Sequence, residues 1–402
     1  MELPPEFEYY LDPVNITPEK LFEGKSGDTL EDAVVFYDGD TDIGNFDVAI
    51  IGVRESVNSP GNSGCAVAPD HIREKLYGLS KPENDIRIID LGNIRGRSAK
   101  DKFVALEEIC TFLIGAKVVP VVLGGSQDLT VSMAAALNSF ENKWAVTLID
   151  PKIDHSGTES DFTSANFLGR LLKEGKDKIN DVTLMGIQKY FCSSSQMKFT
   201  SDNFFNTIRL GELKGDGLLK AEPYIRDTDL LSIDASAVKS TDMPSQKGAM
   251  PNGLLSNEIC QLAWYAGLSD RLKAFGLFEV NPENDNGSSA GVALSSQIVW
   301  HFIDGVSMRY DDYPVKDIES YNIYIVHLDD YGMDIRFFNN SVNGRWWVEV
   351  PGDDEKSIIS CNEDDYKKSV NNEIPEKWIF SLKKSVYKSG NKNNNLSNAD
   401  EK

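Results

Sequence analysis

The segment WAVTLIDPKIDHS (144–156) decides the fold class. Its first part, 144–150, is a mostly apolar run that ends in an aspartate, and it predicts a strand. Polar residues, including Asp150 and Asp154, follow where that strand should end. In open α/β sheets, ligands bind outside the carboxyl ends of the strands. The segment therefore predicts a buried parallel strand with a site at its end.

The same alternation extends in both directions along the chain. Strands are predicted at 46–53, 87–94, 118–125, 144–150, 181–187, 229–235 and 272–280, and helices at 69–79, 101–116, 129–140, 256–268 and 288–306. Strands that alternate with helices predict a parallel sheet wrapped by helices on both faces. Residues 46–306 are therefore expected to form one three-layer α/β domain with a central, mainly parallel sheet.

The flanking segments have a different composition. Residues 1–45 are mostly polar and are interpreted as an N-terminal arm. Residues 307–385 contain three strand patterns with short links and then mixed sequence, which predicts a small antiparallel meander with a short helix. Residues 386–402 are rich in Asn and Lys and are predicted to form a disordered tail. Adjacent strand residues face opposite sides of a sheet, so one of Trp346 and Trp347 should pack inward. The other is then exposed or covered by a partner. Alternatively, both tryptophans close the sheet onto the body of the protein.

Composition and charge exclude several classes of function. The 402 residues include 41 Lys+Arg and 63 Asp+Glu, a formal net charge of −22. This charge argues against binding to nucleic acid or to anionic lipid, both of which need basic residues. Five scattered cysteines without a CxxC pair indicate reduced thiols and a cytoplasmic location. No signal sequence and no apolar run of membrane-spanning length is visible, so no membrane insertion is expected.

Polar clusters follow four of the predicted strands. They are LGGSQDLT (123–130), LIDPKIDHS (148–156), LLSIDASAVKSTDMP (230–244) and FEVNPENDN (278–286). Because the carboxyl ends of parallel strands share one edge of a sheet, the four clusters are expected to converge there.

The order of these clusters resembles the ureohydrolase family of arginase, agmatinase and formimidoylglutamase, whose motifs are GGDHS, DAHxD, SxDxDxxDP and EVNP. The segment SGCAVAPDHIREKL (63–76) also resembles the entry helix of that family. The resemblance covers residues 46–306 and implies a three-layer arginase-like fold. The GGSQDLT segment and the long C-terminal extension are most similar to the formimidoylglutamase-like branch of the Bacteroidetes type.

The resemblance implies a site with two manganese ions, held by two His and four Asp, which supply a hydroxide that attacks a guanidinium or formimino carbon. Three of the six ligand positions are retained here, as Asp150, Asp154 and Asp234. The other three are occupied by Gln127, Lys152 and Ser236. Both imidazoles are therefore missing from the motif positions, and the metal motifs are degenerate.

Three further positions follow from the same resemblance. Glu279 matches the glutamate that faces the substrate guanidinium in arginases, and Leu168 takes the place of a histidine that moves protons there. Asp128 occupies the serine position of the GGDHS motif. The predicted substrate pocket therefore comprises Glu279, Gln127, Lys152, Ser236 and Asp128, and no residue is assigned as catalytic.

Charge counting opposes a metal pair in this set. Three carboxylates and Lys152 sum to −2, so two divalent ions would leave +2, and Gln and Ser are poor manganese ligands beside the His and Asp that they replace. Residues 150, 152 and 154 alternate on an extended segment, so Lys152 is predicted to bridge Asp150 and Asp154 in the place of the metals. His155 is out of phase with them and is not expected to be a ligand.

Two functions remain open. The first is a non-catalytic ureohydrolase-fold protein with a binding or scaffolding role, which needs no cofactor. The alternative is an active formimidoylglutamase- or agmatinase-type hydrolase of linear amidines or guanidines, with manganese in an altered site. A homo-oligomer and a protein partner that binds the C-terminal appendage are further expectations.

Overall fold

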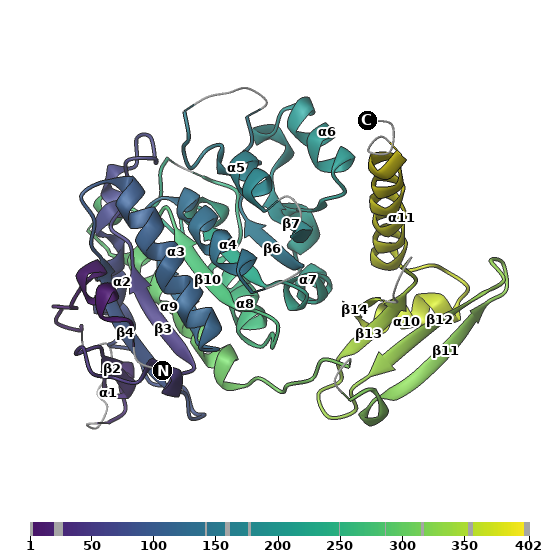
Figure 1. The fold of residues 1–402 in the computed structure, drawn as a ribbon, viewed down its shortest axis with the longest axis horizontal. Coiled ribbons are helices and arrows are strands. Elements are labelled where there is room, and N and C mark those ends of the chain that lie inside the picture. The colour runs from purple at the N-terminus through teal and green to yellow at the C-terminus, as the bar shows by residue number, and fades with distance from the viewer. Residues whose placement is uncertain are drawn as a thin grey trace. The chain divides into compact units, whose positions relative to one another are not determined.

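The computed structural model describes residues 3–19, 27–140, 143–156, 161–175, 178–248, 250–285, 287–314, 317–352 and 357–397. The chain divides into two compact units, residues 1–309 and residues 310–402 (Figure 1). Within the described residues, no helix has the length and apolar character needed to cross a bilayer.

The first unit is built on a ten-stranded sheet with the order β1-β4-β3-β5-β10-β9-β6-β7-β8, in which β2 also pairs with β4. Its strands are β1 (Leu11–Asp12), β2 (Val34–Phe36), β3 (Val48–Gly52), β4 (Ile88–Ile94), β5 (Val119–Leu123), β6 (Trp144–Ile149), β7 (Ile179–Ile187), β8 (Asn206–Arg209), β9 (Leu230–Asp234) and β10 (Ala274–Phe278). Every pairing is parallel except that of β1 with β4. The predicted, mainly parallel sheet is confirmed.

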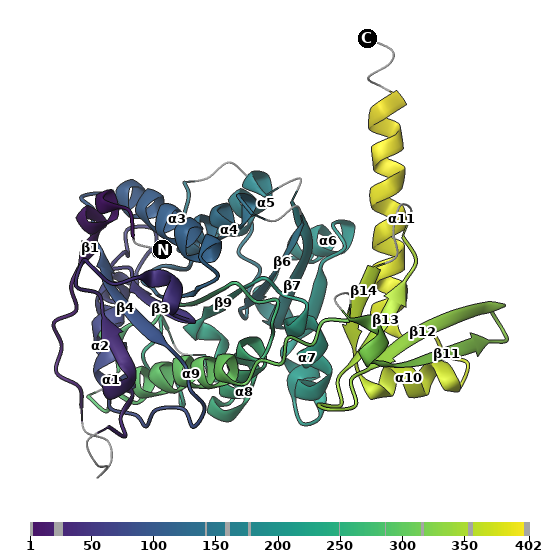
Figure 2. The same cartoon turned by 60° about the horizontal axis from the view of Figure 1, so that its bottom comes forward.

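Helices cover both faces of this sheet (Figure 2). They are α1 (Leu30–Ala33), α2 (Ala68–Leu76), α3 (Ala99–Gly115), α4 (Thr130–Asn138), α5 (Phe167–Glu174), α6 (Ser194–Asp202), α7 (Gly217–Arg226), α8 (Ser256–Gly267) and α9 (Ala290–Ser307). Helices α2, α7, α8 and α9 contribute to one apolar cluster, and α3, α4 and α5 contribute to the other. The neighbours Ile50 and Ile51 of β3 enter opposite clusters, because successive strand side chains point to opposite faces. The predicted three-layer α/β architecture is confirmed.

The structure adds strands that the sequence pattern does not indicate. Residues 1–45, interpreted from sequence as an arm, contribute β1 and β2 to the edge of the sheet beside β4. These strands have two and three residues, too few to show a period-2 pattern. Strand β8 (Asn206–Arg209) also lacks a buried apolar run, because it is the last strand of the sheet on its side.

The second unit contains an antiparallel four-stranded sheet in the order β11-β12-β13-β14. Its elements are β11 (Asn322–Leu328), β12 (Met333–Asn339), β13 (Trp346–Val350), β14 (Ser357–Cys361), α10 (Glu363–Val370) and α11 (Glu376–Ser397). The meander predicted from sequence has one more strand, β14. Helix α11 extends over residues 386–397 of the predicted tail, and near its start Trp378 and Leu382, one helical turn apart, join the apolar cluster of this unit. Residues 398–402 of that predicted tail lie outside the described residues.

Both tryptophans of β13 are covered within their own unit. Trp347 is buried against Tyr321, with ring centroids 5.5 Å apart, and belongs to a small cluster with Phe338. Trp346, on the other face, stacks on Tyr366 of α10 at 4.8 Å. The tryptophan pair therefore does not require a partner protein, and a partner for this unit remains a prediction.

The loop after β5 is fixed by close backbone packing against the segment after β3. Gly125 donates its N–H to the Val53 carbonyl at 3.0 Å, and a Cβ on Gly125 would lie 1.6 Å from the Glu55 carbonyl oxygen. Only glycine therefore allows this approach of two main chains.

We expect the variant Gly125→Ala to lose at least about 2 kcal/mol of unfolding free energy, because the loop must move to admit the methyl group. Gly211→Ala is the matched control, since a Cβ there meets nothing within 4 Å. Urea denaturation monitored by tryptophan fluorescence measures both. Equal stabilities for the two variants would contradict the packing described here.

Candidate carboxylate site

Three aspartates meet at the carboxyl ends of two neighbouring strands. Asp150 directly follows β6 and Asp234 is the last residue of β9, and these strands pair in parallel with Ile149 opposite Ile233. Asp154 comes from the loop after β6. One carboxylate oxygen from each of the three lies within 4.8 Å of the others, so the set could hold a cation.

Burial and mutual repulsion raise the pKa of all three carboxyl groups. Burial is the larger cause for each. The pKa of Asp154 rises to about 7, with a further contribution from the charge of Asp234, and the pKa values of Asp150 and Asp234 rise well above their usual range. Over the described residues, no lysine or arginine nitrogen lies within 4.0 Å of these carboxylates. The charge of Lys152 lowers the pKa of Asp150 and Asp154 only in part, so this buried group of carboxylates still favours protons or a bound cation.

Lys152 does not bridge the aspartates, so this prediction from the sequence is wrong. The Asp150 carboxylate accepts a hydrogen bond from the Lys152 backbone N–H at 2.7 Å, which turns the chain immediately after β6. The alternation of an extended strand therefore ends at Ile149. The Lys152 residue is exposed, and its Nζ lies 5.8 Å from the centroid of the Phe191 ring.

Glu279 is fixed beside this cluster by three hydrogen bonds. Its Oε2 accepts from Ser59 Oγ at 2.5 Å and from Asn62 Nδ2 at 2.8 Å, and its Oε1 accepts from the Gln127 backbone N–H at 3.0 Å. Its backbone is left-handed, with φ of 62°, which is uncommon for a residue with a side chain. Strained backbone of this kind persists where the surroundings enforce it, often at functional sites.

A pocket of about 130 Å³ opens over these acidic groups. Asp154, Asp234 and Glu279 provide its acidic lining, and Lys152 and Lys247 line it as well. Ser236, predicted as a pocket residue, also lines it, and its N–H donates to Asp234 Oδ1 at 2.6 Å. The structure thus brings Glu279, Lys152 and Ser236 to one pocket with two of the three aspartates.

Gln127 and Asp128, which were predicted as pocket residues, are not among the residues that line this pocket. Gln127 is fully buried, with Nε2 3.4 Å from Ser232 Oγ. Asp128 is fully buried and accepts from Asn58 Nδ2 at 2.6 Å, and burial raises its pKa to about 6. Both residues open the helical turn that leads into α4, which directs their side chains into the protein.

Sequence reasoning missed the residues that come from loops. Ser59 and Asn62 belong to the Gly/Ser/Asn-rich loop after β3, and Lys247 donates a hydrogen bond to the Pro60 carbonyl oxygen of the same loop. Polar composition directly after a strand was the available signal for Ser59 and Asn62.

His155, which was not expected to be a metal ligand, stacks on Phe199 of α6, with ring centroids 3.9 Å apart.

The sequence matches the arginase family over residues 46–304. The chain belongs to the arginase family. Among curated proteins it is similar to the formimidoylglutamase of Bacillus subtilis (strain 168), with 22% identity over 308 residues that cover 71% of this chain and 95% of that protein. It is also similar to the formimidoylglutamase of Salmonella agona (strain SL483), with 23% identity over 252 residues that cover 60% and 79% of the two chains.

Solved structures share the fold. The formiminoglutamase of Trypanosoma cruzi, crystallised with Mn²⁺, superposes with a TM-score of 0.61 at 22% identity and covers 66% of this chain and 95% of that one. The formimidoylglutamase of Bacillus subtilis gives a TM-score of 0.63 at 20% identity, with 72% and 95% covered. The arginase-like fold expected from the sequence motifs is confirmed. Within the ureohydrolases, the chain is related to the formimidoylglutamase-like members.

The donor set can be tested against the manganese pair that the family implies. Three carboxylates within 4.8 Å suit one hard divalent ion, for which oxygen ligands are typical. A second ion would need further donors, yet Gln127 is fully buried and does not line the pocket, and Lys152 supplies an ammonium group. The residues fit one divalent ion and do not fit the pair.

Burial of the aspartates and the repulsion among them should make the unfolding free energy depend on pH. The folded-state pKa of Asp154, about 7, lies above the value of about 3.9 for an unfolded chain, so protonation favours the folded state. The stability from this group is present below pH 4 and is lost as pH rises to 7. We expect Asp154→Asn to stabilise the protein by about 1 kcal/mol at pH 8 in metal-free buffer, and by less at pH 5.

Thermal unfolding at the two pH values measures this difference. Asp242→Asn is the control, because the Asp242 carboxylate accepts the Ser256 N–H at 3.0 Å and pairs with Lys239 at 3.3 Å, which lowers its pKa. That variant should lose stability. A loss of stability in Asp154→Asn at pH 8 would show that the cluster is already neutralised.

Proposed function

We propose that this chain is a non-catalytic member of the arginase family whose acidic pocket binds a cationic ligand of the guanidine or amidine class. The observation that carries the proposal is the group of three aspartates within 4.8 Å, accompanied by Glu279 and by no ion-paired lysine or arginine among the described residues. The site keeps three aspartates together with Glu279, beside Lys152 and Lys247 in the pocket lining, while it lacks the donors for a metal pair.

The electrostatics favour a cationic ligand. A single positive charge 4 Å from one carboxylate gains about 4 kcal/mol at an effective dielectric of 20, before the cost of desolvation. Guanidinium and amidinium groups are planar and bind carboxylates through two parallel hydrogen bonds, which matches a pocket lined by Asp154, Asp234 and Glu279. A pocket of about 130 Å³ is below the usual range for a whole drug-sized ligand and suits a small head group.

The absence of the expected catalytic groups supports a binding role. Gln127 and Lys152 stand at the two positions where the family motifs have histidine, and Ser236 stands at an aspartate position. Leu168, at the position of a proton-moving histidine, is buried in the apolar core. The described pocket lining therefore contains no imidazole that could exchange a proton with a leaving group near neutral pH.

The second candidate is an active hydrolase of linear amidines or guanidines with an altered metal site. Two observations favour it: the aspartates converge closely enough to hold one divalent ion, and both curated relatives are formimidoylglutamases. That reading requires hydrolysis to proceed with one manganese ion instead of two.

Calorimetric titration with agmatine in metal-free buffer tests the proposal. We expect saturable binding that strengthens as the pH rises from 6 to 8, because Asp154, with a pKa of about 7, must lose its proton to pair with the cation. Asp234→Asn should weaken binding at least tenfold, whereas Asp242→Asn, outside the pocket, should leave it unchanged. Absence of binding at pH 8, or affinity that falls with rising pH, would contradict the proposal.

Restoring the missing donors tests the explanation for the lost metal pair. The double variant Lys152→His, Ser236→Asp changes two residues that line the pocket to the types of the family motifs, and we expect it to hold more manganese per chain than Lys152→His alone. The gain should exceed the sum of the single changes, since the ligands of a metal pair act together. Metal analysis after equilibrium dialysis measures this, and equal manganese content in the double variant and in Lys152→His would contradict it.

A further inference from the structure

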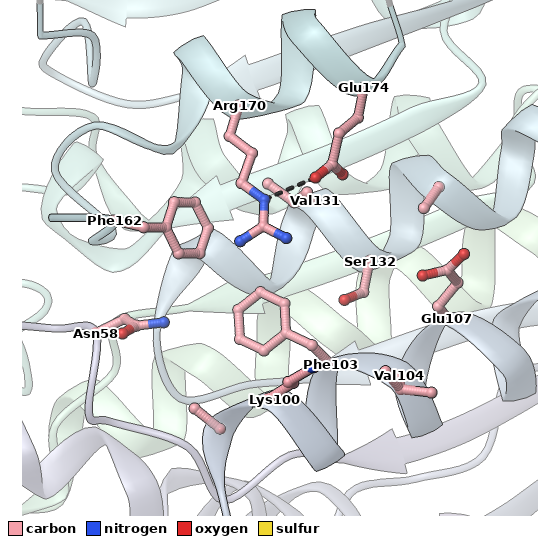
Figure 3. Close-up of a pocket in the computed structure, with 12 residues that line it drawn as sticks. Asn58, Lys100, Phe103, Val104, Glu107, Val131, Ser132, Phe162, Arg170 and Glu174 are labelled. Carbon is pink, nitrogen blue, oxygen red and sulfur yellow. Dashed lines mark hydrogen bonds and ion pairs between the residues drawn. The ribbon is translucent and has the colours of Figure 1, made fainter. Parts of the chain in front are cut away.

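A second and larger pocket lies among helices α3, α4 and α5 (Figure 3). Its volume is about 360 Å³, and it shares no lining residue with the acidic pocket. Its walls combine two aromatic rings, aliphatic side chains and charged groups, which is the composition of a small-molecule site. Nothing in the proposed function uses it.

Arg170 of α5 is held so that part of its guanidinium faces the pocket. Its Nε donates to Glu174 Oε1 at 2.7 Å, and its Cζ lies 4.5 Å from the centroid of the Phe162 ring. Its two terminal nitrogens point into the pocket (Figure 3), and they donate to no side chain or carbonyl among the described residues. A guanidinium fixed along one side presents its remaining N–H groups in a geometry that matches a carboxylate.

The wall below Arg170 is apolar. The rings of Phe103 and Phe162 meet edge to face, with centroids 5.9 Å apart, and Val131 completes this surface. Ser132 of α4 faces the same space, and its hydroxyl is drawn there in Figure 3. A ligand with a flat or branched apolar body would therefore bury that body against the rings while a polar end reaches Arg170.

The remaining charged groups disfavour a ligand that carries two negative charges. Glu107 and Glu174 both line the pocket, and burial together with the charge of Glu174 raises the pKa of Glu107. A dianion such as a phosphate monoester would meet repulsion from these carboxylates. Lys100 also lines the pocket and adds a positive charge.

We propose that this α3–α5 pocket, lined by Arg170, Lys100, Phe103, Phe162, Val131 and Ser132, is a binding site for a small organic monocarboxylate with an apolar or aromatic body. The carboxylate pairs with the terminal nitrogens of Arg170, and the body packs on Phe103 and Phe162. The site is independent of the acidic pocket and of the function proposed for it.

Ligand-observed NMR and calorimetry with phenylacetate test the proposal on the full chain. We expect saturable binding of phenylacetate, with at least tenfold weaker binding of its neutral amide, phenylacetamide, and of phenyl phosphate. Arg170→Met should weaken phenylacetate binding at least tenfold. Lys173→Met, on the same helix but outside the pocket, is the matched control and should bind like the unmodified protein.

Several outcomes would overturn the proposal. These are no saturable binding of phenylacetate, equal binding of phenylacetamide, tighter binding of phenyl phosphate, or unchanged affinity in Arg170→Met. Agmatine binding separates this test from the function proposed above, because Arg170→Met should leave it unchanged and Asp234→Asn should leave phenylacetate binding unchanged. Since Arg170 is a surface residue of α5, its replacement should not prevent folding.

Discussion

The site is governed by the repulsion among three aspartates. Among the described residues, no lysine or arginine forms an ion pair with them. The parallel pairing of β6 with β9 places Asp150 and Asp234 at the same level of the sheet edge, and the turn after β6 returns Asp154 to them. The sheet is buried on both faces, so these strands cannot separate to relieve the repulsion. The carboxylates must therefore hold protons or bind a cation, and their raised pKa values reflect that choice.

The second layer of the site holds Glu279 in place. Ser59 and Asn62, from the loop after β3, donate to its carboxylate, and the backbone N–H of Gln127 donates from the loop after β5. Two separate loops thus hold the carboxylate of this residue, whose backbone is left-handed. A cation that enters the pocket meets a preorganised acceptor, so binding does not require rearrangement of the protein.

The sequence predicted the parts of this structure that rest on burial and strand order. The long apolar strands, the helices between them and the convergence of Asp150, Asp234 and Glu279 all follow from strand ends that share one edge. The position of Lys152 was not predictable in this way, because the Lys152 backbone N–H donates to the Asp150 carboxylate and this turn ends the strand periodicity.

Other features were missed for equally physical reasons. Strands β1 and β2 are too short to show a pattern, and Lys247 reaches the pocket from a loop that carries no motif. The structure likewise buries Gln127, whose backbone N–H donates to Glu279, although its motif position suggested a pocket residue.

The manganese content of the unmodified protein, measured by metal analysis after equilibrium dialysis, separates a binding protein from an active hydrolase when it is combined with an assay for hydrolysis of formimidoylglutamate. We expect at most one manganese ion per chain and no turnover. Two ions per chain with turnover would show that the protein is an active hydrolase.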